Sequence, residues 1–285
     1  MEENDMSDTM HEKVITTDSL PARSFSYSSA DQLITNHWHN SLEVLYIASG
    51  KMDTGINNAI YHLKRGDLII INSGDIHFTR CRDYAKIYVL QVPYPLLNTH
   101  IPNYDYVRFQ DSDGSVVFSN PAKVDELSRL MIQMYEITLE QKPGYTLLFS
   151  SKLYQFLFIL FQRYHTDISS RTKQKSDRNL IRLEQVMNYV KSHYTQPISL
   201  EDAAQILSLN PEYFCRYFKK YMGMTFLEYV NSIRLYHIHQ DLLNTNYSVS
   251  ELMDRHGFTN YKLFSKMFRN TYGCPPGMFR RQQKQ

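Results

Sequence analysis

Short apolar runs rich in β-branched and aromatic residues, separated by turn-forming pairs, extend from Leu33 to residue 92. Runs of this kind at close spacing predict a small β-sandwich or barrel, which we assign to residues 31–120. Residues 1–30 are polar and aperiodic, and we expect them to form a flexible tail or an edge strand. The predicted strands are Glu43–Ala48, Asp53–Ile56, Ala59–Leu63, Asp67–Ile71 and Lys86–Val92.

The pattern changes to helical spacing at Pro121, a residue that suits the first turn of a helix. A second helical run, Tyr145 to Tyr164, is apolar nearly all round. Such a helix is expected to be buried against its neighbour, the barrel or a second subunit. We therefore interpret residues 121–165 as a helical packing or dimerisation segment, and the polar residues 166–180 as an interdomain linker.

Residues 181–283 contain two similar segments. One reads Phe214-x3-Phe218-Lys219-x3-Gly223 and the other Phe264-x3-Phe268-Arg269-x3-Gly273, offset by 50 residues at every position. Each is preceded by a serine that can cap a helix, in Ser199-x-x-Asp202 and in Ser248-x-x-Glu251. Internal repetition of this kind predicts an all-α domain built from two equivalent units.

Each unit combines a short helix, a tight turn and a second helix with a basic outer face, which is typical of a helix-turn-helix. The guanidinium of Arg216 suits bidentate contact with guanine, whereas Lys219 and Lys220 suit phosphates. The stripes expected to be buried are Phe214, Tyr217, Phe218 and Tyr221, and Leu263, Phe264, Met267 and Phe268. The predicted DNA-contacting residues are Pro211, Glu212, Cys215, Arg216, Lys219 and Lys220, and Asn260, Tyr261, Lys262, Ser265, Lys266 and Arg269.

The distribution of charge separates the two halves of the chain. Residues 1–170 carry 14 Lys+Arg against 20 Asp+Glu, and the remaining residues carry 17 against 9. A basic C-terminal half favours nucleic-acid binding. The three widely spaced cysteines, together with an acidic and polar N-terminus, favour a reducing cytoplasm over a secreted disulfide framework. No apolar run reaches the roughly 20 residues that a membrane-spanning helix needs, so we expect no membrane association.

The predicted barrel contains a group of polar residues suited to a binding site. His37, His39 and Glu43 lie at even separations, so an extended strand would turn them to one face, and His77 follows on a neighbouring strand. The pattern resembles the two motifs of the cupin fold, where such residues hold a divalent metal inside a jelly roll. Asn72 departs from that pattern. The four residues are candidates for binding a small ligand, with a metal site as the alternative.

The C-terminal half resembles the AraC/XylS family of bacterial transcriptional regulators, and the resemblance covers residues 183–281. The motifs that carry it are Arg234-Leu235, His256-Gly257-Phe258, Phe264-x3-Phe268 and Tyr272-Gly273-x-Pro275-Pro276. The barrel is similar to the cupin-type sensor common in that family. The resemblance implies an α+β chain in which a cupin-like barrel and two helices precede a tandem helix-turn-helix domain.

The expected function is that of a DNA-binding regulator, more specifically an activator controlled by a small ligand. The resemblance implies a sugar or oligosaccharide as effector, with double-stranded DNA, RNA polymerase and a second copy of the chain as partners. We expect no enzyme activity and no cofactor. Two alternatives stay open: a metal-binding cupin enzyme fused to a DNA-binding module, and a constitutive regulator whose β domain serves only to dimerise.

Overall fold

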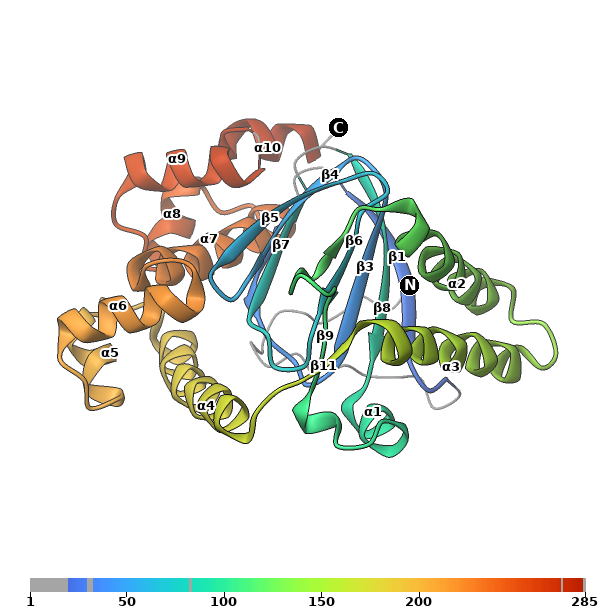
Figure 1. The fold of residues 1–285 in the computed structure, drawn as a ribbon. Coiled ribbons are helices and arrows are strands. Elements are labelled where there is room, and N and C mark those ends of the chain that lie inside the picture. The colour runs from blue at the N-terminus through green and yellow to red at the C-terminus, as the bar shows by residue number, and fades with distance from the viewer. Residues whose placement is uncertain (1–19, 30–32, 82–83, 273, 284–285) are drawn as a thin grey trace. The chain divides into compact units, whose positions relative to one another are not determined.

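The computed structural model describes residues 20–29, 33–81, 84–272 and 274–283 of the 285-residue chain. The chain divides into two compact units, one built mainly from residues up to Arg178 and the other mainly from Asn179 to Gln285. The first unit is rich in β-structure and the second is helical (Figure 1). The α+β fold with two domains that the sequence predicts is therefore confirmed.

Two antiparallel sheets form the body of the N-terminal unit (Figure 1). The larger has the order β1 (Arg23–Ser29), β8 (Ala85–Val92), β3 (Leu42–Ser49), β6 (Leu68–Ile71) and β10 (Val117–Phe118). The smaller has the order β2 (Leu33–His37), β7 (His77–Cys81), β4 (Lys51–Ile56) and β5 (Ala59–Lys64). A separate pair joins β9 (Val107–Phe109) to β11 (His165–Asp167).

Strand β3 shows how the sequence positions the inside of the barrel. Alternate side chains of a strand point to opposite faces of its sheet. Leu45 and Ile47 pack with Met52 of the smaller sheet in the core between the sheets, whereas Val44 packs in a separate core with the helices. Because both faces of the strand are covered, its hydrophobic run is nearly continuous, and Glu43 is a buried charge on the inner face.

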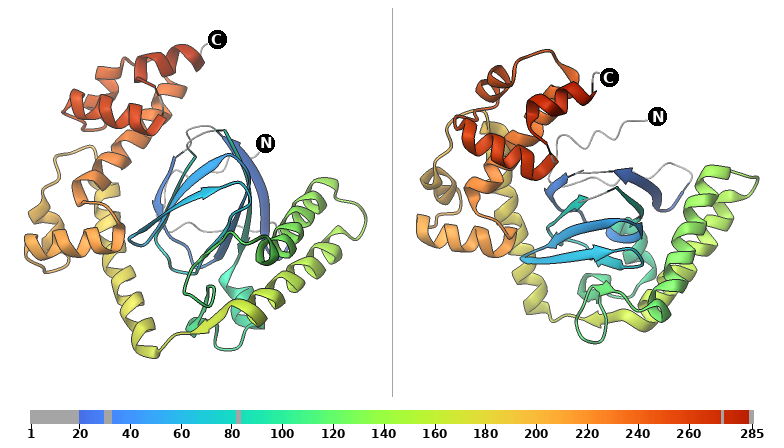
Figure 2. Two further views of the ribbon diagram at one scale, coloured as in Figure 1. Left: turned by 45° about the horizontal axis from the view of Figure 1, so that its top comes forward. Right: turned by 90° about the horizontal axis from the view of Figure 1, so that it is seen from above.

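The outer face of the larger sheet is covered by two long helices, α2 (Pro121–Glu140) and α3 (Tyr145–Tyr164) (Figure 2). The side chain of Asn120 accepts a hydrogen bond from the backbone N–H of Ala122, which caps α2. Both helices begin where the sequence predicts. The short helices α1 (Tyr94–His100) and η1 (Tyr104–Tyr106) precede them.

The structure confirms one of the two alternatives for the N-terminal residues and corrects two other sequence-based expectations for this unit. Residues 23–29 form the edge strand β1, whereas residues 1–19 of the expected tail lie outside the described part of the chain. Helix α3 is buried on one side only, because Leu147 and Phe158 are 77% and 62% exposed. The expected linker 166–180 contains the end of β11 and the first turns of α4 (Ser170–His193). Its polar residues are compatible with a helix that has little to bury there.

The C-terminal unit contains the second part of α4 and six further helices of the described chain. They are α5 (Leu200–Ile206), α6 (Pro211–Met222), α7 (Phe226–Asn244), α8 (Val249–Arg255), α9 (Tyr261–Tyr272) and α10 (Pro276–Gln283). Ser199 and Ser248 cap α5 and α8 as predicted, each accepting a hydrogen bond from a backbone amide three residues on. Thr225 and Glu228 form a further capping box at the start of α7.

The central helix α7 packs against the second helix of each repeat. Phe218 of α6 lies 5.6 Å from Tyr229 of α7, measured between ring centroids. On the other side, His239 of α7 lies 4.1 Å from Tyr272 of α9. Both repeats are therefore fixed to one helix by aromatic contacts. Among the described residues, no helix is long and apolar enough to cross a membrane.

Candidate functional site

Helix α6 presents one face to its own core and the other to solvent. Phe214, Tyr217 and Phe218 are buried, as their spacing predicts. The side chain of Asn210 accepts a hydrogen bond from the backbone N–H of Tyr213 and fixes the start of the helix, with Pro211 in its first turn. The predicted contact residues exposed on the outer face are Glu212, Cys215, Arg216, Lys219 and Lys220. Tyr213, which was not among the predicted contact residues, is 46% exposed beside them.

Helix α9 repeats this arrangement fifty residues later. Asn260 caps it by accepting a hydrogen bond from the backbone N–H of Leu263 at 2.9 Å. Phe264 and Phe268 are buried, whereas Leu263, expected in the buried stripe, is 39% exposed. A hollow of about 400 Å³ lies on the outer face. Its lining consists of Tyr261, Lys262, Ser265, Lys266, Arg269 and Asn270, all of which are predicted contact residues except Asn270.

The segment that leads into the first repeat is held by Arg234, a half-buried residue of α7. Arg234 donates hydrogen bonds from Nε to the carbonyl of Tyr194 at 2.7 Å and from Nη2 to the carbonyl of Gln196 at 2.8 Å. Gly257 follows α8 with φ +68°, and a Cβ built there would lie 2.4 Å from the carbonyl oxygen of Thr195. These contacts explain why an arginine and a glycine occupy these positions of the family motif.

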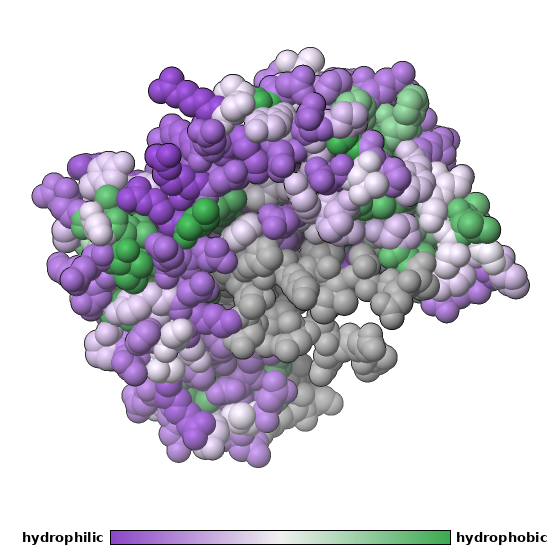
Figure 3. Space-filling model, turned by 90° about the horizontal axis from the view of Figure 1, so that it is seen from below, coloured by the Kyte–Doolittle hydropathy of each residue, from purple (hydrophilic) through white to green (hydrophobic). Residues whose placement is uncertain are grey.

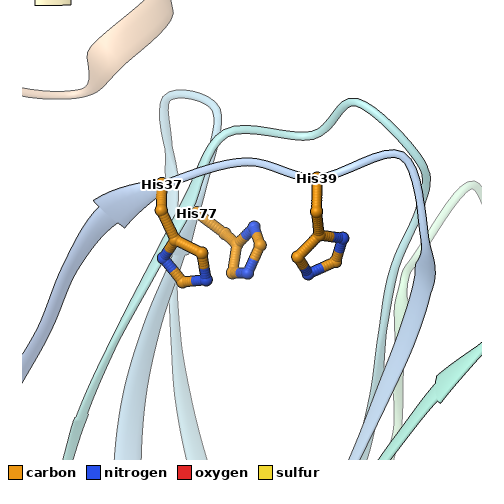
Figure 4. A group of neighbouring side chains, drawn as sticks. All are labelled: His37, His39 and His77. Carbon is orange, nitrogen blue, oxygen red and sulfur yellow. The ribbon is translucent and has the colours of Figure 1, made fainter. Parts of the chain in front are cut away.

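The four candidate ligand residues of the barrel converge at one end of strands β2 and β7. The imidazoles of His37, His39 and His77 point into the same space (Figure 4), and their nearest ligand atoms all lie within 4.8 Å of one another. Glu43 Oε2 lies 3.0 Å from Nε2 of His39, and its Oε1 lies 4.0 Å from Nε2 of His77. The expectation of one extended strand is wrong: His37 ends β2 in the smaller sheet, whereas Glu43 lies on β3 in the larger sheet. The pairing of β2 with β7 adds His77.

The side chains of His39 and Glu43 are each oriented by a further hydrogen bond. Nδ1 of His39 lies 3.0 Å from the carbonyl oxygen of Ser41. Gln91 donates from Nε2 to Oε2 of Glu43 at 2.7 Å. Gln91 was not among the predicted residues, and its position opposite Glu43 in the β3–β8 register is the signal that identifies it. The result is a buried, polar and pre-arranged group of side chains.

The charge on Glu43 is stabilised in spite of burial. Burial raises the pKa of its carboxyl, but the hydrogen bond from His39 and the positive charges of His39 and His37 outweigh that effect. The pKa therefore lies below its ordinary value. Three imidazoles and one carboxylate form a donor set that fits a divalent metal ion as well as the hydroxyl groups of a polar ligand.

Comparison with known proteins gives matches along most of the chain. A model described as "AraC-like ligand binding domain" matches residues 24–157, and a model described as "Helix-turn-helix domain" matches residues 203–282. The uncharacterized transcriptional regulator YdeC of Bacillus subtilis is 23% identical over 84% of this chain and 84% of its own length. The transcriptional activator RhaS of an Enterobacter species is 23% identical over 84% of this chain and 85% of its own.

Among solved structures, ToxT of Vibrio cholerae is 16% identical, with a TM-score of 0.44 over 91% of this chain and 97% of that one. The ligand-binding family model matches the N-terminal structural unit, and the helix-turn-helix family model matches the C-terminal unit. The first assigns ligand binding to the β-rich domain, and the second assigns the repeated helices to a DNA-binding motif. The chain therefore belongs to the AraC family of transcriptional regulators, with an N-terminal ligand-binding domain and a C-terminal DNA-binding helix-turn-helix domain.

Proposed function

We propose that the outer faces of α6 and α9 contact two major grooves of one DNA duplex and that Arg216 and Lys266 read bases there. The two residues occupy equivalent positions in the repeats, and both are exposed among further basic side chains. That equivalence is the observation that carries the proposal. Arginine and lysine suit the acceptors of guanine in the major groove, whereas Lys219, Lys220 and Arg269 supply contacts to phosphates.

The test measures binding of the full chain to labelled promoter DNA at several salt concentrations. We expect affinity to fall steeply with salt, and Lys220→Ala to lower the slope of log K against log salt by about 0.9, the value of one phosphate contact. Lys142→Ala is the matched control, because Lys142 is exposed, pairs with Glu140 and lies in the other unit. Affinity that does not depend on salt would contradict the proposal.

We further propose that the histidine and glutamate group of the barrel binds the effector, and that the effector is a carbohydrate. Imidazole, carboxylate and amide groups at fixed positions match the alternating donors and acceptors of sugar hydroxyls. His39, Glu43 and Gln91 are buried, so hydrogen bonds formed there do not compete with bulk water.

Calorimetric titration of the chain with a panel of mono- and oligosaccharides tests this assignment. We expect one sugar to bind with 1:1 stoichiometry. Gln91→Ala is expected to weaken sugar binding by about 10-fold or more, because it removes one hydrogen bond to a charged group. His62→Ala is expected to leave the affinity for the sugar unchanged. His62 belongs to the same unit but its side chain is 70% exposed. If the bound sugar leaves the affinity for DNA unchanged, the alternative of a constitutive regulator is favoured instead.

The sign of regulation and the assembly complete the proposal. We propose an activator that contacts RNA polymerase, and the similarity to RhaS, a transcriptional activator, supports this sign. We propose no enzyme activity, because the matching relatives are regulators.

The chain is proposed to dimerise through the exposed apolar side of α2 and α3. Leu139 of α2 and Leu147 and Phe158 of α3 are more than half exposed, which is unfavourable in a monomer in water. In Figure 3 hydrophobic residues are green, and such residues reach the surface of the molecule. We expect Phe158→Glu to convert a dimer into a monomer in light scattering, and Ile60→Glu, at an exposed apolar position on β5, to leave the dimer intact.

A further inference from the structure

We propose that the turn Asn72–Asp75 couples the histidine and glutamate group of the barrel to β11 and the start of α4. A change at the group then alters the stability of the segment that leads to the C-terminal unit. Only the identification of the group as the effector site rests on the proposed function. The connection itself lies within the N-terminal unit and can be measured without an effector.

On one side, the turn holds two histidines of the group. The backbone N–H of Gly74 donates a hydrogen bond to the carbonyl oxygen of His39 at 2.9 Å. Nδ1 of His77 lies 2.9 Å from the carbonyl oxygen of Asp75. The Nε2 atoms of the two histidines lie 3.0 and 4.0 Å from the carboxylate oxygens of Glu43. The backbone of the turn is therefore fixed against the polar group.

On the other side, the turn holds strand β9 through the side chain of Asn72. Its Nδ2 donates a hydrogen bond to the carbonyl oxygen of Phe109 at 3.1 Å, and its Oδ1 accepts one from the backbone N–H of Phe109 at 2.7 Å. Asn72 is 3% exposed and Phe109 is fully buried, so loss of the amide would leave two buried backbone groups without these bonds. This contact gives a role to the residue that departs from the cupin pattern.

Two further residues of the turn contact the same segment. The carboxylate of Asp75, which is 3% exposed, accepts a hydrogen bond from Nη2 of Arg108 on β9 at 2.8 Å. Such a partner is needed because an unpaired buried charge is costly. Oγ of Ser73 and the hydroxyl oxygen of Tyr104 in η1 lie 2.6 Å apart and share a hydrogen bond. Together with Asn72, these residues fix the turn to β9 and η1.

Strand β9 connects the turn to α4. It pairs with β11 in antiparallel register, with Thr166 opposite Arg108. The backbone N–H of Ile168 donates a hydrogen bond to the carbonyl oxygen of Tyr106 at 2.7 Å, and α4 begins two residues later (Figure 1). Helix α4 begins in the N-terminal unit, and from Asn179 onward it belongs to the C-terminal unit.

These contacts link Glu43 to the start of α4 without interruption. Because buried polar groups seldom go without partners, a shift of His39 or His77 displaces the turn, and β9 moves with it. A ligand that binds one arrangement of the group better than another then changes the population of arrangements at β11. Coupling of this kind is an energy, and a mutant cycle between the two ends of the path measures it.

Hydrogen exchange followed by mass spectrometry on the full chain tests the proposal through peptides that cover residues 165–173. Glu43→Gln keeps the size of the side chain and removes the charge that faces the histidines. It is expected to speed exchange in these peptides by about 3- to 10-fold. Asn72→Ala is expected to speed it by about 10-fold or more, because two buried groups lose their partner. In the Asn72→Ala background, Glu43→Gln is expected to add less than about 1.5-fold.

Asn120→Ala is the matched control. The side chain of Asn120 also accepts a hydrogen bond from a backbone N–H of this unit, that of Ala122 at 3.0 Å, but at the start of α2. In this background Glu43→Gln is expected to keep its full effect on residues 165–173. Arg108, whose side chain is 27% exposed, offers a second pair of variants that does not depend on the folding of Asn72→Ala. Arg108→Gln breaks the ion pair and is expected to reduce the effect of Glu43→Gln, whereas Arg108→Lys keeps the charge and is expected to preserve it.

An effect of Glu43→Gln that is absent, or that is equal in the unchanged chain and in the Asn72→Ala and Arg108→Gln backgrounds, would overturn the proposal. Equal acceleration by Asn72→Ala in residues 165–173 and in α2 would overturn it as well, because that result indicates a general loss of stability. Neither result affects the assignment of a sugar, which the calorimetric titration tests separately.

Discussion

Protonation of His239 is expected to destabilise the DNA-binding domain in mild acid. The ring of His239 stacks on Tyr272 at 4.1 Å with an interplanar angle of 9°, and it lies 5.0 Å from the ring of Phe279. Burial among these rings disfavours the charged imidazolium and lowers the pKa of His239 to about 4. In the unfolded chain the pKa returns to its ordinary value of about 6.5.

The sign of the pH dependence follows from these two values. Between pH 6.5 and 4 the unfolded chain binds a proton that the folded domain excludes. The contribution of His239 to stability is therefore fully present above about pH 6.5 and is lost as the pH falls towards 4. From pH 7.5 to pH 5 the two pKa values give a loss of about 2 kcal/mol, and screening of a partly accessible ring reduces it to roughly 1–2 kcal/mol.

Hydrogen exchange followed by mass spectrometry measures this effect locally, through peptides from α7 and α9 of the full chain. After correction for the intrinsic pH dependence of exchange, the opening free energy is expected to fall between pH 7.5 and 5 in the unchanged chain. His239→Phe keeps the stacking and is expected to remove roughly 1–2 kcal/mol of that fall. His193→Phe is the control, because His193 also stacks on a tyrosine of this unit, Tyr189. An equal fall in all three proteins would refute the reasoning.

Two further predictions concern the packing of the repeats, both measured by the same exchange experiment. Gly257→Ala is expected to destabilise the contact with Thr195 by about 2 kcal/mol or more, because φ is positive and a Cβ would lie 2.4 Å from the carbonyl oxygen of Thr195. Gly277→Ala is the control and is expected to be neutral or stabilising, because Gly277 lies inside a helix and a Cβ there would meet no atom within 4 Å. Equal effects of the two changes would contradict this. Phe264→Ala removes a fully buried ring and is expected to destabilise α9 by about 3–5 kcal/mol, against less than about 1 kcal/mol for the exposed Leu263→Ala. A similar loss for both would show that the repeat is packed differently.

Much of the fold could be predicted because local signals and tertiary packing agree. Three predicted helices, which start at Pro121, Pro211 and Ser248, each have a residue suited to a helix start followed by a periodic apolar face. The structure confirms all three. Strands near the middle of the larger sheet, such as Leu42–Ser49, are buried on both faces and produce clear apolar runs.

The elements that were missed, or that the sequence left open between two alternatives, lack such a signal. Edge strand β1, Arg23–Ser29, alternates serine with larger residues, and its pairing with β8 is decided by contacts distant in sequence. The start of α4 at Ser170 is polar on every side, so no periodicity marks it. The exposure of Leu147 and Leu263 could not be read from composition either, because an apolar residue at helical spacing does not reveal how wide the covered stripe is.

The candidate sites likewise differ in how far the sequence alone predicts them. For the outer face of α9, the spacing of residues along one helix was enough to predict the site, because five predicted side chains line one hollow. The convergence of His37, His39 and Glu43 was expected for the wrong reason, because His37 and Glu43 lie on strands of two different sheets. Gln91 requires the register of β8 against β3, which the sequence does not state.

Selection of DNA sites from a random duplex library tests the central claim most directly. The full chain is expected to enrich sequences with two conserved blocks whose centres lie about 10–10.5 base pairs apart, one for each recognition helix. Arg216→Ala is expected to relax the sequence of one block only, and Lys266→Ala that of the other only, while Lys142→Ala leaves both unchanged. Enrichment of a single block, or loss of the same block in both variants, would contradict an account in which α6 and α9 each read one groove.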